Sequence, residues 1–142
     1  MPVAKAFARW NGDLPTGAGQ FTAGDSISGG YTYKSRFEGG PGSNPEQLIA
    51  AAHAACFSMA LASAVAAAGH TAESIETNAE VTLRPIDGRP TISTITLNTR
   101  GKVAGLDEQT FRALAADAKA GCPVSRALAG VPEITVDASL VS

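Results

Sequence analysis

Two cysteines, Cys56 and Cys122, are the most reactive side chains that this 142-residue sequence offers. A cysteine thiolate is both a nucleophile and a metal ligand. The two residues are far apart in the sequence, so only the fold can bring them together. They could form a redox pair, or they could be two buried structural thiols, since free cysteine is among the most buried residue types. A zinc site is disfavoured, because His53 and His70 complete no CxxC or HxxxH spacing.

His53 and Glu46 lie in the same predicted helix as Cys56, in the segment NPEQLIAAAHAACFSMALASAVAAAGH. His53 is three residues before Cys56, so the two share one helical face. His53 could polarise the thiol, or it could be a satisfied histidine of a core or interface. Glu46 lies about 15 Å from Cys56 along a straight helix. It could act with Cys56 only through a bridging group, a kink or a partner subunit, and otherwise it is a solvated first-turn acid.

A reactive Cys56 would need a nearby cation. Its apolar neighbours raise the pKa of the thiol, and the helix dipole fades within the first turn. Arg36, in the stretch KSRFEGG, is the first candidate. Its planar guanidinium could grip Glu46 and still present positive charge to the sulfur. Arg126, close to Cys122 in the sequence, is the second candidate.

The elements that must position these residues are predicted from hydrophobic periodicity and turn residues. The predicted order is βββ-α-ββ-α-α-β, which is an α+β arrangement rather than a series of alternating βαβ units. Strands are expected over 3–10, twice within 19–37 with breaks at Gly24-Asp25 and Gly29-Gly30, and over 74–86, 91–104 and 133–141. Helices are expected over 45–68, from near Asp107 to Gly121, and in short turns over 122–130.

The first long helix has well-marked ends. Asn44 is a good N-cap, Pro45 suits the first helical position, Gln47 completes a capping-box pattern, and Gly69 is the expected stop. A straight helix of about 25 residues spans roughly 37 Å, whereas a domain of this size has a radius of gyration of about 14–15 Å. Because the helix is apolar on nearly every side, it must be covered all round. An intertwined homodimer is the favoured explanation, and a kinked helix wrapped by its own chain is the alternative.

The composition is that of one globular domain over residues 1–142, with 44% hydrophobic and 17% charged residues. A net charge of -2 gives no sign of a nucleic-acid or anionic-membrane partner. The N-terminal stretch lacks a secretory signal, which predicts a cytoplasmic protein without a permanent disulfide. Residues 44–68 are long enough to span a membrane, but the alanine-rich composition and His53 disfavour that interpretation.

Two segments resemble the signature regions of the osmotically inducible protein C (OsmC) family, which is related to the organic hydroperoxide resistance (Ohr) proteins. These segments are SRFEGGPGSNPEQLIAAAHAACFSMALA and KAGCPVSRALAGVPEITVDASLV. The resemblance extends over essentially the whole chain, and the wording AAHAACFSMAL is similar to the OsmC branch.

The resemblance implies a thiol-dependent peroxidase that works as an intertwined homodimer, with active sites at the subunit interface. The fold that it implies has antiparallel sheets wrapped around long central helices. It implies that Cys56 attacks an organic hydroperoxide, that Cys122 resolves the resulting sulfenic acid as a disulfide, and that Arg36 and Glu46 assist. A dithiol, thought to be of the lipoyl type in the family, would recycle the enzyme. No metal, flavin or haem is implied.

Two alternatives remain open from the residues themselves. The chain could be a non-catalytic redox sensor or a stress-related binding module, which would form one disulfide per chain without turnover. Phe57, Met59 and Phe37 could line a pocket for an organic tail and so favour alkyl hydroperoxides over hydrogen peroxide. They could instead be core residues, and for Met59 we expect the core.

Overall fold

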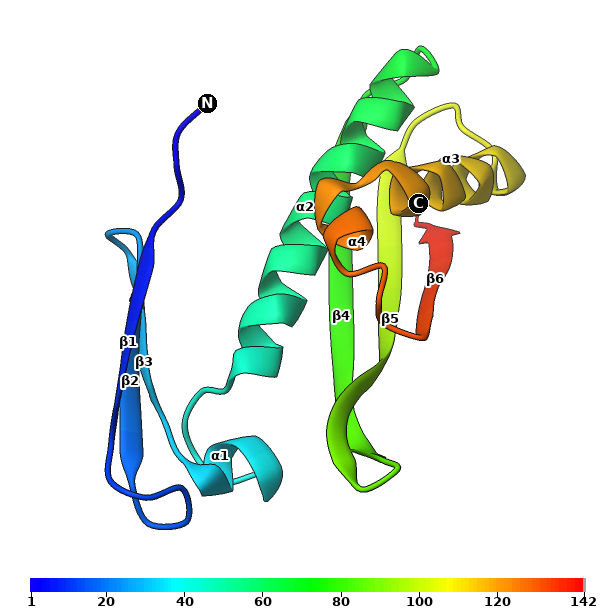
Figure 1. Ribbon diagram of the computed structural model, residues 1–142. Helices are drawn as coiled ribbons and strands as arrows, with labels where there is room; N and C mark the ends of the chain where they lie inside the picture. Colours follow the sequence, from blue (N-terminus) through cyan, green and yellow to red (C-terminus); the bar gives the residue numbers. More distant parts are fainter. Residues whose placement is uncertain (142) are drawn as a thin grey trace. The chain divides into compact units, whose positions relative to one another are not determined.

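A computed structural model describes residues 1–141 of the chain (Figure 1). The chain divides into two compact units, Met1–Leu48 and Ile49–Ser142, which we call unit 1 and unit 2. The elements run in the order β1-β2-β3-α1-α2-β4-β5-α3-α4-β6. The predicted mixed α+β class is confirmed, and the observed order adds one short helix, α1, to the predicted order.

Unit 1 contains a three-stranded antiparallel sheet in the order β1-β2-β3. Its strands are β1 (Ala6–Asn11), β2 (Ala18–Ala23) and β3 (Ile27–Tyr31). The expectation that Gly29 and Gly30 break a strand is wrong, because both lie inside β3. A Cβ atom at Gly29 would approach the ring of Phe21 to 3.0 Å. Glycine therefore lets this aromatic ring lie against the sheet.

The added helix α1 (Tyr33–Phe37) falls where strand was expected. A reciprocal capping box starts it, because the Ser35 N–H donates to Thr32 Oγ1 and the Thr32 N–H donates to Ser35 Oγ. These two local bonds satisfy backbone donors that a helix start leaves open. They outweigh the strand propensity of the aromatic residues at either end of α1.

Helix α2 (Pro45–Ala67) begins and ends where the sequence predicts. The Gln47 N–H donates to Asn44 Oδ1 at 2.8 Å, and Gly69 follows the helix with a φ of 88°. The helix is long and apolar enough to cross a membrane by length and composition alone, with a mean hydropathy of 1.8. Its buried face packs into a protein core, as described below.

Unit 2 is built on the sheet β4-β5-β6. Strands β4 (Ala72–Ile86) and β5 (Arg89–Val103) form a long antiparallel hairpin. Strand β6 (Glu133–Leu140) pairs with β5 in parallel, which differs from the expected antiparallel arrangement. The reason is the connection through α3 (Glu108–Gly121) and α4 (Pro123–Ala127). This crossover returns the chain to the end of the sheet where β5 begins, so β6 runs in the same direction as β5.

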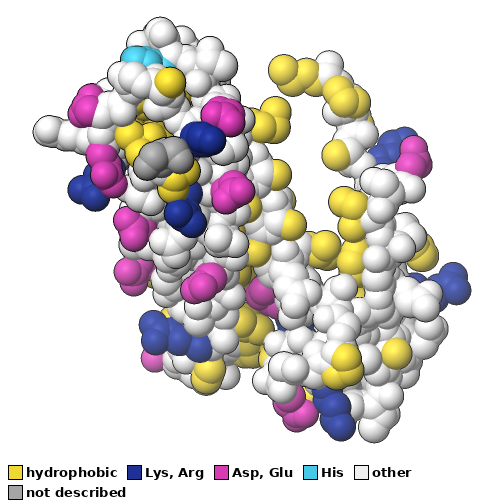
Figure 2. All heavy atoms as spheres, turned by 180° about the vertical axis from the view of Figure 1, so that it is seen from behind, with side chains coloured by type: hydrophobic (Ala, Val, Ile, Leu, Met, Phe, Trp, Pro, Cys, Tyr) yellow, Lys and Arg dark blue, Asp and Glu magenta, His cyan; other side chains and the backbone are white. Residues whose placement is uncertain are grey.

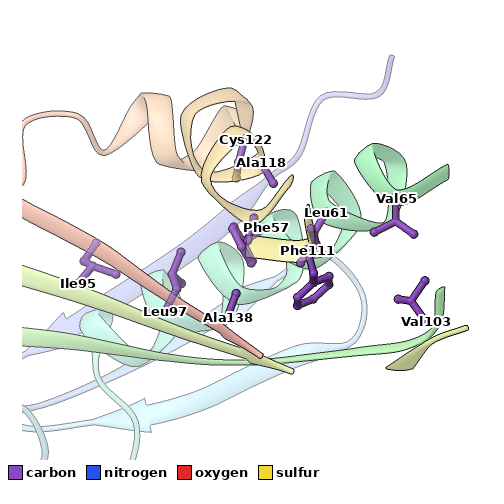
Figure 3. Packing of buried hydrophobic residues seen from close by; sticks show 11 residues of the cluster. Phe57, Leu61, Val65, Ile95, Leu97, Val103, Phe111, Ala118, Cys122 and Ala138 are labelled. Carbon is purple, nitrogen blue, oxygen red and sulfur yellow. The ribbon is translucent and has the colours of Figure 1, made fainter. Parts of the chain in front are cut away.

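The hydrophobic core lies in unit 2, between the sheet and the helices α2 and α3 (Figure 3). Every second residue of β5 from Ser93 to Val103 is buried, which is the period of a half-covered strand. The fully buried apolar side chains come from α2, β5 and α3: Phe57, Leu61, Val65, Ile95, Leu97, Phe111 and Ala115.

Unit 1 has little core of its own. Within residues 1–48, all of which the structure describes, Phe21 is the one buried hydrophobic residue. Phe7, Leu14 and Ile27 are each more than half exposed. Hydrophobic side chains accordingly appear at the surface in Figure 2. A three-stranded sheet is stable only when its apolar face packs against other parts of a protein.

Candidate active site

The two thiols lie side by side in unit 2. Cys56 projects from the middle of α2, Cys122 lies at the junction of α3 and α4, and their sulfur atoms are 3.0 Å apart. Both cysteines are free; Cys122 is fully buried and Cys56 is half-buried. The Cys122 thiol is the donor of this close S–H···S contact, and the separation exceeds the disulfide length of about 2.05 Å. Oxidation therefore needs an approach of about 1 Å rather than a rearrangement of the helices.

Local structure fixes the direction of Cys122. Its N–H donates to Ala118 O at 2.8 Å and closes α3, while Pro123 begins α4 at a position where a missing N–H is harmless. The chain turns sharply between the two helices at this residue. The turn directs the Cys122 side chain toward α2.

The two thiols differ in acidity. Burial raises the pKa of Cys56, the hydrogen bond with Cys122 and the charge of Cys122 raise it further, and only the Val124 amide lowers it. Burial also raises the pKa of Cys122, but its hydrogen bonds with Cys56, with the amide and hydroxyl of Ser125 and with the Val124 amide outweigh burial, so the pKa of Cys122 is lowered. Within one chain, Cys122 is therefore the more acidic thiol.

Arg36 and Glu46 form a close ion pair in unit 1. Arg36 Nε donates to both carboxylate oxygens at 3.2 and 3.3 Å, and Nη2 donates to Oε1 at 2.8 Å. The Glu46 side chain is 8% exposed and the Arg36 side chain 38% exposed. The interpretation of Glu46 as a solvated acid is thus wrong. No described residue accepts a hydrogen bond from Arg36 Nη1.

Side-chain bonds around Ser35 hold the ion pair in place. The Ser35 hydroxyl donates to Ser43 O at 2.7 Å, and Asn44 Nδ2 donates to Ser35 O at 3.0 Å. These bonds tie α1, which carries Arg36, to the two residues that precede α2, the helix that carries Glu46. Along a regular helix, the ten positions from Glu46 to Cys56 on α2 correspond to about 15 Å of rise.

His53 is bonded to Ser125. Its ring is fully buried, and Nε2 lies 2.6 Å from Ser125 Oγ. Nδ1 is buried without a hydrogen-bond partner among residues 1–141. Burial lowers the pKa of His53. The expected alternatives for His53 were a group that polarises Cys56 and a satisfied core histidine, and the observed arrangement is neither: one nitrogen is paired, and its partner is Ser125.

The remaining candidates are placed as follows. Arg126 is exposed and does not contribute to the lowered pKa of Cys122. Phe57 is a core residue, and Met59 is 75% exposed, so the expectation that Met59 lies in the core is wrong. Phe37 is partly exposed, and the Arg36 guanidinium carbon lies 5.3 Å from the centre of the Phe37 ring. Among residues 1–141, no three His, Cys, Asp or Glu side chains are placed to hold a metal ion.

A pocket of about 260 Å³ adjoins Arg36 in unit 1. Its lining is mostly aromatic: Trp10, Leu14, Tyr31, Thr32, Tyr33, Arg36 and Phe37. An apolar wall beside one fixed cation suits an organic molecule with a polar or anionic end.

Comparisons with known proteins agree with this geometry. A family model described as OsmC-like protein matches residues 38–137. The chain is 44% identical over 140 residues to Peroxiredoxin OsmC of Escherichia coli (strain K12), a match that covers 97% of this chain and 96% of the relative. The protein of the same name from Shigella flexneri matches equally well.

Solved structures give the same picture. The organic hydroperoxide resistance protein OhrB of Bacillus subtilis is 28% identical, covers 98% of each chain and has a TM-score of 0.71. An OsmC-like protein from Mycoplasma pneumoniae is 19% identical, covers 99% of each chain and has a TM-score of 0.75. At that lower identity, the second match shows the shared fold alone.

Proposed function

The chain belongs to the OsmC-like protein family, and we propose on this basis that its two thiols reduce organic hydroperoxides to alcohols. The family predicted from the sequence is confirmed by the comparisons. The predicted class of enzyme, a cysteine-based hydroperoxide peroxidase, is also confirmed, since the 44% identical relative is a peroxiredoxin. The observation that carries the assignment to particular residues is the 3.0 Å separation of the Cys56 and Cys122 sulfurs.

The proposed cycle has three steps. The Cys56 thiolate attacks the hydroperoxide, the O–O bond breaks, the alkoxide takes up a proton to leave as an alcohol, and Cys56 becomes a sulfenic acid. The Cys122 sulfur then attacks the Cys56 sulfur, so that an S–S bond forms, the S–O bond breaks and water leaves. A dithiol, which we expect to be of the lipoyl type, reduces the disulfide by exchange and is itself oxidised.

We propose that Cys56 is activated from outside its own chain. The pKa of Cys56 is raised within one chain, and no cation among residues 1–141 acts to lower it. We place Arg36 of the partner subunit beside Cys56, steadied by Glu46 of the partner subunit. Support comes from the unused Nη1 donor of Arg36 and from the rigid bidentate grip of the carboxylate.

An intertwined homodimer would supply this arrangement. Exposed apolar residues recur every three or four positions along α2, which is the spacing of a helix–helix contact: Ala52, Ala55, Met59, Ala62 and Ala66. We call this set the α2 stripe. A second copy of the chain would cover both the stripe and the nearly coreless sheet of unit 1. A lipid bilayer would suit the stripe but not the polar backbone and charges of that sheet.

Two further proposals concern the whole chain. We propose that units 1 and 2 act as one functional domain over 1–142, because the matched range 38–137 crosses their boundary. We also propose a cytoplasmic location, where reduced thiols and a dithiol reductant coexist.

The mass of the intact protein after one equivalent of cumene hydroperoxide tests the assignment. Wild-type protein should lose two hydrogens, while Cys122→Ser should gain one oxygen at Cys56. Cys56→Ser should be inert and serves as the control. No mass change in either of the first two proteins would refute the assigned roles. Turnover of many equivalents with dihydrolipoamide, rather than one, separates the peroxidase from a redox sensor.

A further inference from the structure

A buried polar pair lies behind the two thiols and has no part in the cycle described above. It consists of His53 on α2 and Ser125 on α4, joined at 2.6 Å. The His53 ring is fully buried and the Ser125 residue is 7% exposed. Ser125 is three residues after Cys122, so its hydroxyl lies on the helical face of that sulfur. A histidine placed in a core only to fill space would not be expected to leave a buried ring nitrogen without a partner.

The lack of a partner for His53 Nδ1 indicates which of the two groups, His53 Nε2 or Ser125 Oγ, is the donor of their hydrogen bond. If Nδ1 carried the proton, a buried N–H group would have no acceptor among the described residues. Buried N–H donors without partners are rarer than under-satisfied acceptors. The proton of His53 is therefore assigned to Nε2, which donates to Ser125 Oγ. The hydroxyl of Ser125 accepts this bond and is left with its own proton to donate elsewhere.

We propose that His53 is a positioning residue for the resolving step: by donating to Ser125 Oγ, it turns the Ser125 hydroxyl proton toward Cys122 Sγ, where the proton stabilises the thiolate that attacks Cys56. The inference rests on the proposed roles of the two cysteines. The Ser125 hydroxyl acts on Cys122 by lowering its pKa, and His53 acts only through Ser125. The pair therefore serves the resolving cysteine and not the cysteine that attacks the peroxide.

The chemistry of the step balances without a charged histidine. Cys122 gives up its proton, its thiolate attacks the sulfenic sulfur of Cys56, and the S–S bond forms as the S–O bond breaks. The departing hydroxide takes up one proton and leaves as water. The two sulfurs reach the disulfide level together, so no further oxidant or reductant is required. His53 keeps its proton throughout and supplies only the fixed orientation of a hydroxyl dipole.

The electrostatics of the site agree with this role. The hydroxyl and amide of Ser125 both act to lower the pKa of Cys122. Burial lowers the pKa of His53, so the ring stays neutral and can act as a single donor at Nε2. Among the described residues, Cys56 is the one titratable group that contributes to the pKa shift of Cys122.

The rate of disulfide formation as a function of pH tests the proposal. Protein oxidised rapidly with one equivalent of hydroperoxide is quenched at intervals by alkylation and analysed by mass. In Ser125→Ala, the midpoint of the profile should rise by about one pH unit, because a hydrogen bond to a charged group is lost. The variant should be roughly threefold slower below both midpoints. It should be roughly threefold faster above them, since a thiolate of higher pKa is the better nucleophile.

Three further variants separate orientation from packing. Ser125→Thr keeps a hydroxyl and His53→Gln keeps a donor near the Nε2 position, so both should retain the wild-type midpoint. His53→Leu should move the midpoint in the direction of Ser125→Ala, and combining the two should add nothing. Ser58→Ala is the matched control. It removes a comparable hydroxyl bond on α2, to Thr77 Oγ1 at 2.7 Å, and should leave the profile unchanged.

The outcomes distinguish this inference from the proposed function. If Cys122→Ser yields no sulfenic acid at Cys56, the assigned roles of the cysteines fail. If the sulfenic acid and the disulfide both form, and Ser125→Ala slows resolution by one constant factor at every pH, the pair is merely structural and the relay is overturned. A crossing of the two pH profiles supports the relay.

Discussion

Each polar side chain at the thiol centre has a different reason to be buried. Hydrogen bonds lower the pKa of Cys122, whereas burial and the neighbouring thiol raise the pKa of Cys56. Burial lowers the pKa of His53. Within one chain, these effects favour ionisation of Cys122, the proposed resolving thiol, over ionisation of Cys56.

The neutral state of His53 has a consequence for stability. Its pKa in the folded chain is below the ordinary value of 6.5. Above pH 6.5 both states hold the ring neutral; as the pH falls through 6.5 toward the folded pKa, only the unfolded chain takes up the proton. The folded state should therefore lose up to about 1.4 kcal/mol per pH unit in this window. His53→Gln should remove that part of the acid sensitivity.

Denaturant unfolding at pH 8 and pH 5 measures the effect. The difference between wild type and His53→Gln at pH 8 reports lost packing alone, because the ring is neutral in both states there. The difference should shrink or reverse at pH 5. An equal difference at the two pH values would show that the folded chain binds the proton after all.

Residue type explains which site residues could be predicted. The thiols stand out because a sequence with two cysteines offers few other nucleophiles, and the resemblance to a family then gives them roles. Arg36 could be paired with Glu46 from charge and geometry. Ser125 could not be found, because serine is common and its importance depends on a histidine that the fold brings from α2. Its spacing of three residues from Cys122 was the one available signal.

Between elements, close packing depends on particular glycines. Gly101 on β5 faces α3, and a Cβ atom there would lie 2.5 Å from the ring of Phe111. That ring is fully buried in the core. The helix can approach the strand this closely only because one side chain is missing.

Gly101→Ala should therefore lower the free energy of unfolding by about 1–3 kcal/mol, since the Phe111 ring must shift within a packed core. Gly121→Ala is the matched control: its Cβ atom would meet nothing within 4 Å, at the end of α3. That variant should be neutral or slightly more stable, by less than about 1 kcal/mol. Urea unfolding of both variants checks the contrast, and equal effects would contradict it.

The elements themselves differed in how far they could be predicted. The ends of α2 and α3 are marked by local signals, including Asn44, Gly69 and Asp107, and these signals act regardless of the rest of the fold. Helix α1 is too short to show a helical period, and its cap depends on two ordinary hydroxyl residues. The parallel pairing of β6 with β5 is set by the path of the crossover, which no local pattern records.

At the scale of the whole molecule, the α2 stripe and the sheet of unit 1 both need cover. Met59 lies at the middle of the stripe and is 75% exposed in one chain. Met59→Asp should place a charge in the proposed interface and shift the protein from dimer to monomer, as measured by sedimentation. Ala116→Asp, on the exposed face of α3, is the control and should not change the mass. A Met59→Asp protein that remains dimeric would exclude this interface.

A shared active site makes a sharper prediction. Cys56→Ser and Arg36→Met should each be inactive alone, the latter because Cys56 loses its cation. In a mixed dimer, one site would combine an intact Cys56 with Arg36 of the partner subunit. Equal mixing, with exchange of subunits, should restore about a quarter of wild-type activity, since half the dimers hold one good site of two. No recovery, despite mixed dimers seen by native mass spectrometry, would place Arg36 and Cys56 in the same chain.

The two cysteines lie far apart along the chain. Sixty-six positions separate them, so their disulfide closes a large loop and removes chain entropy from the unfolded state worth about 4 kcal/mol. By linkage, folding shifts the balance between disulfide and dithiol toward the disulfide by the same amount, which lowers the reduction potential of the pair by roughly 90 mV relative to the unfolded chain. The recycling reductant must overcome this bias at every turn. Each oxidised molecule should also resist unfolding and proteolysis more than its reduced counterpart. After exposure to peroxide, the oxidised form should therefore persist until a dithiol reduces its disulfide.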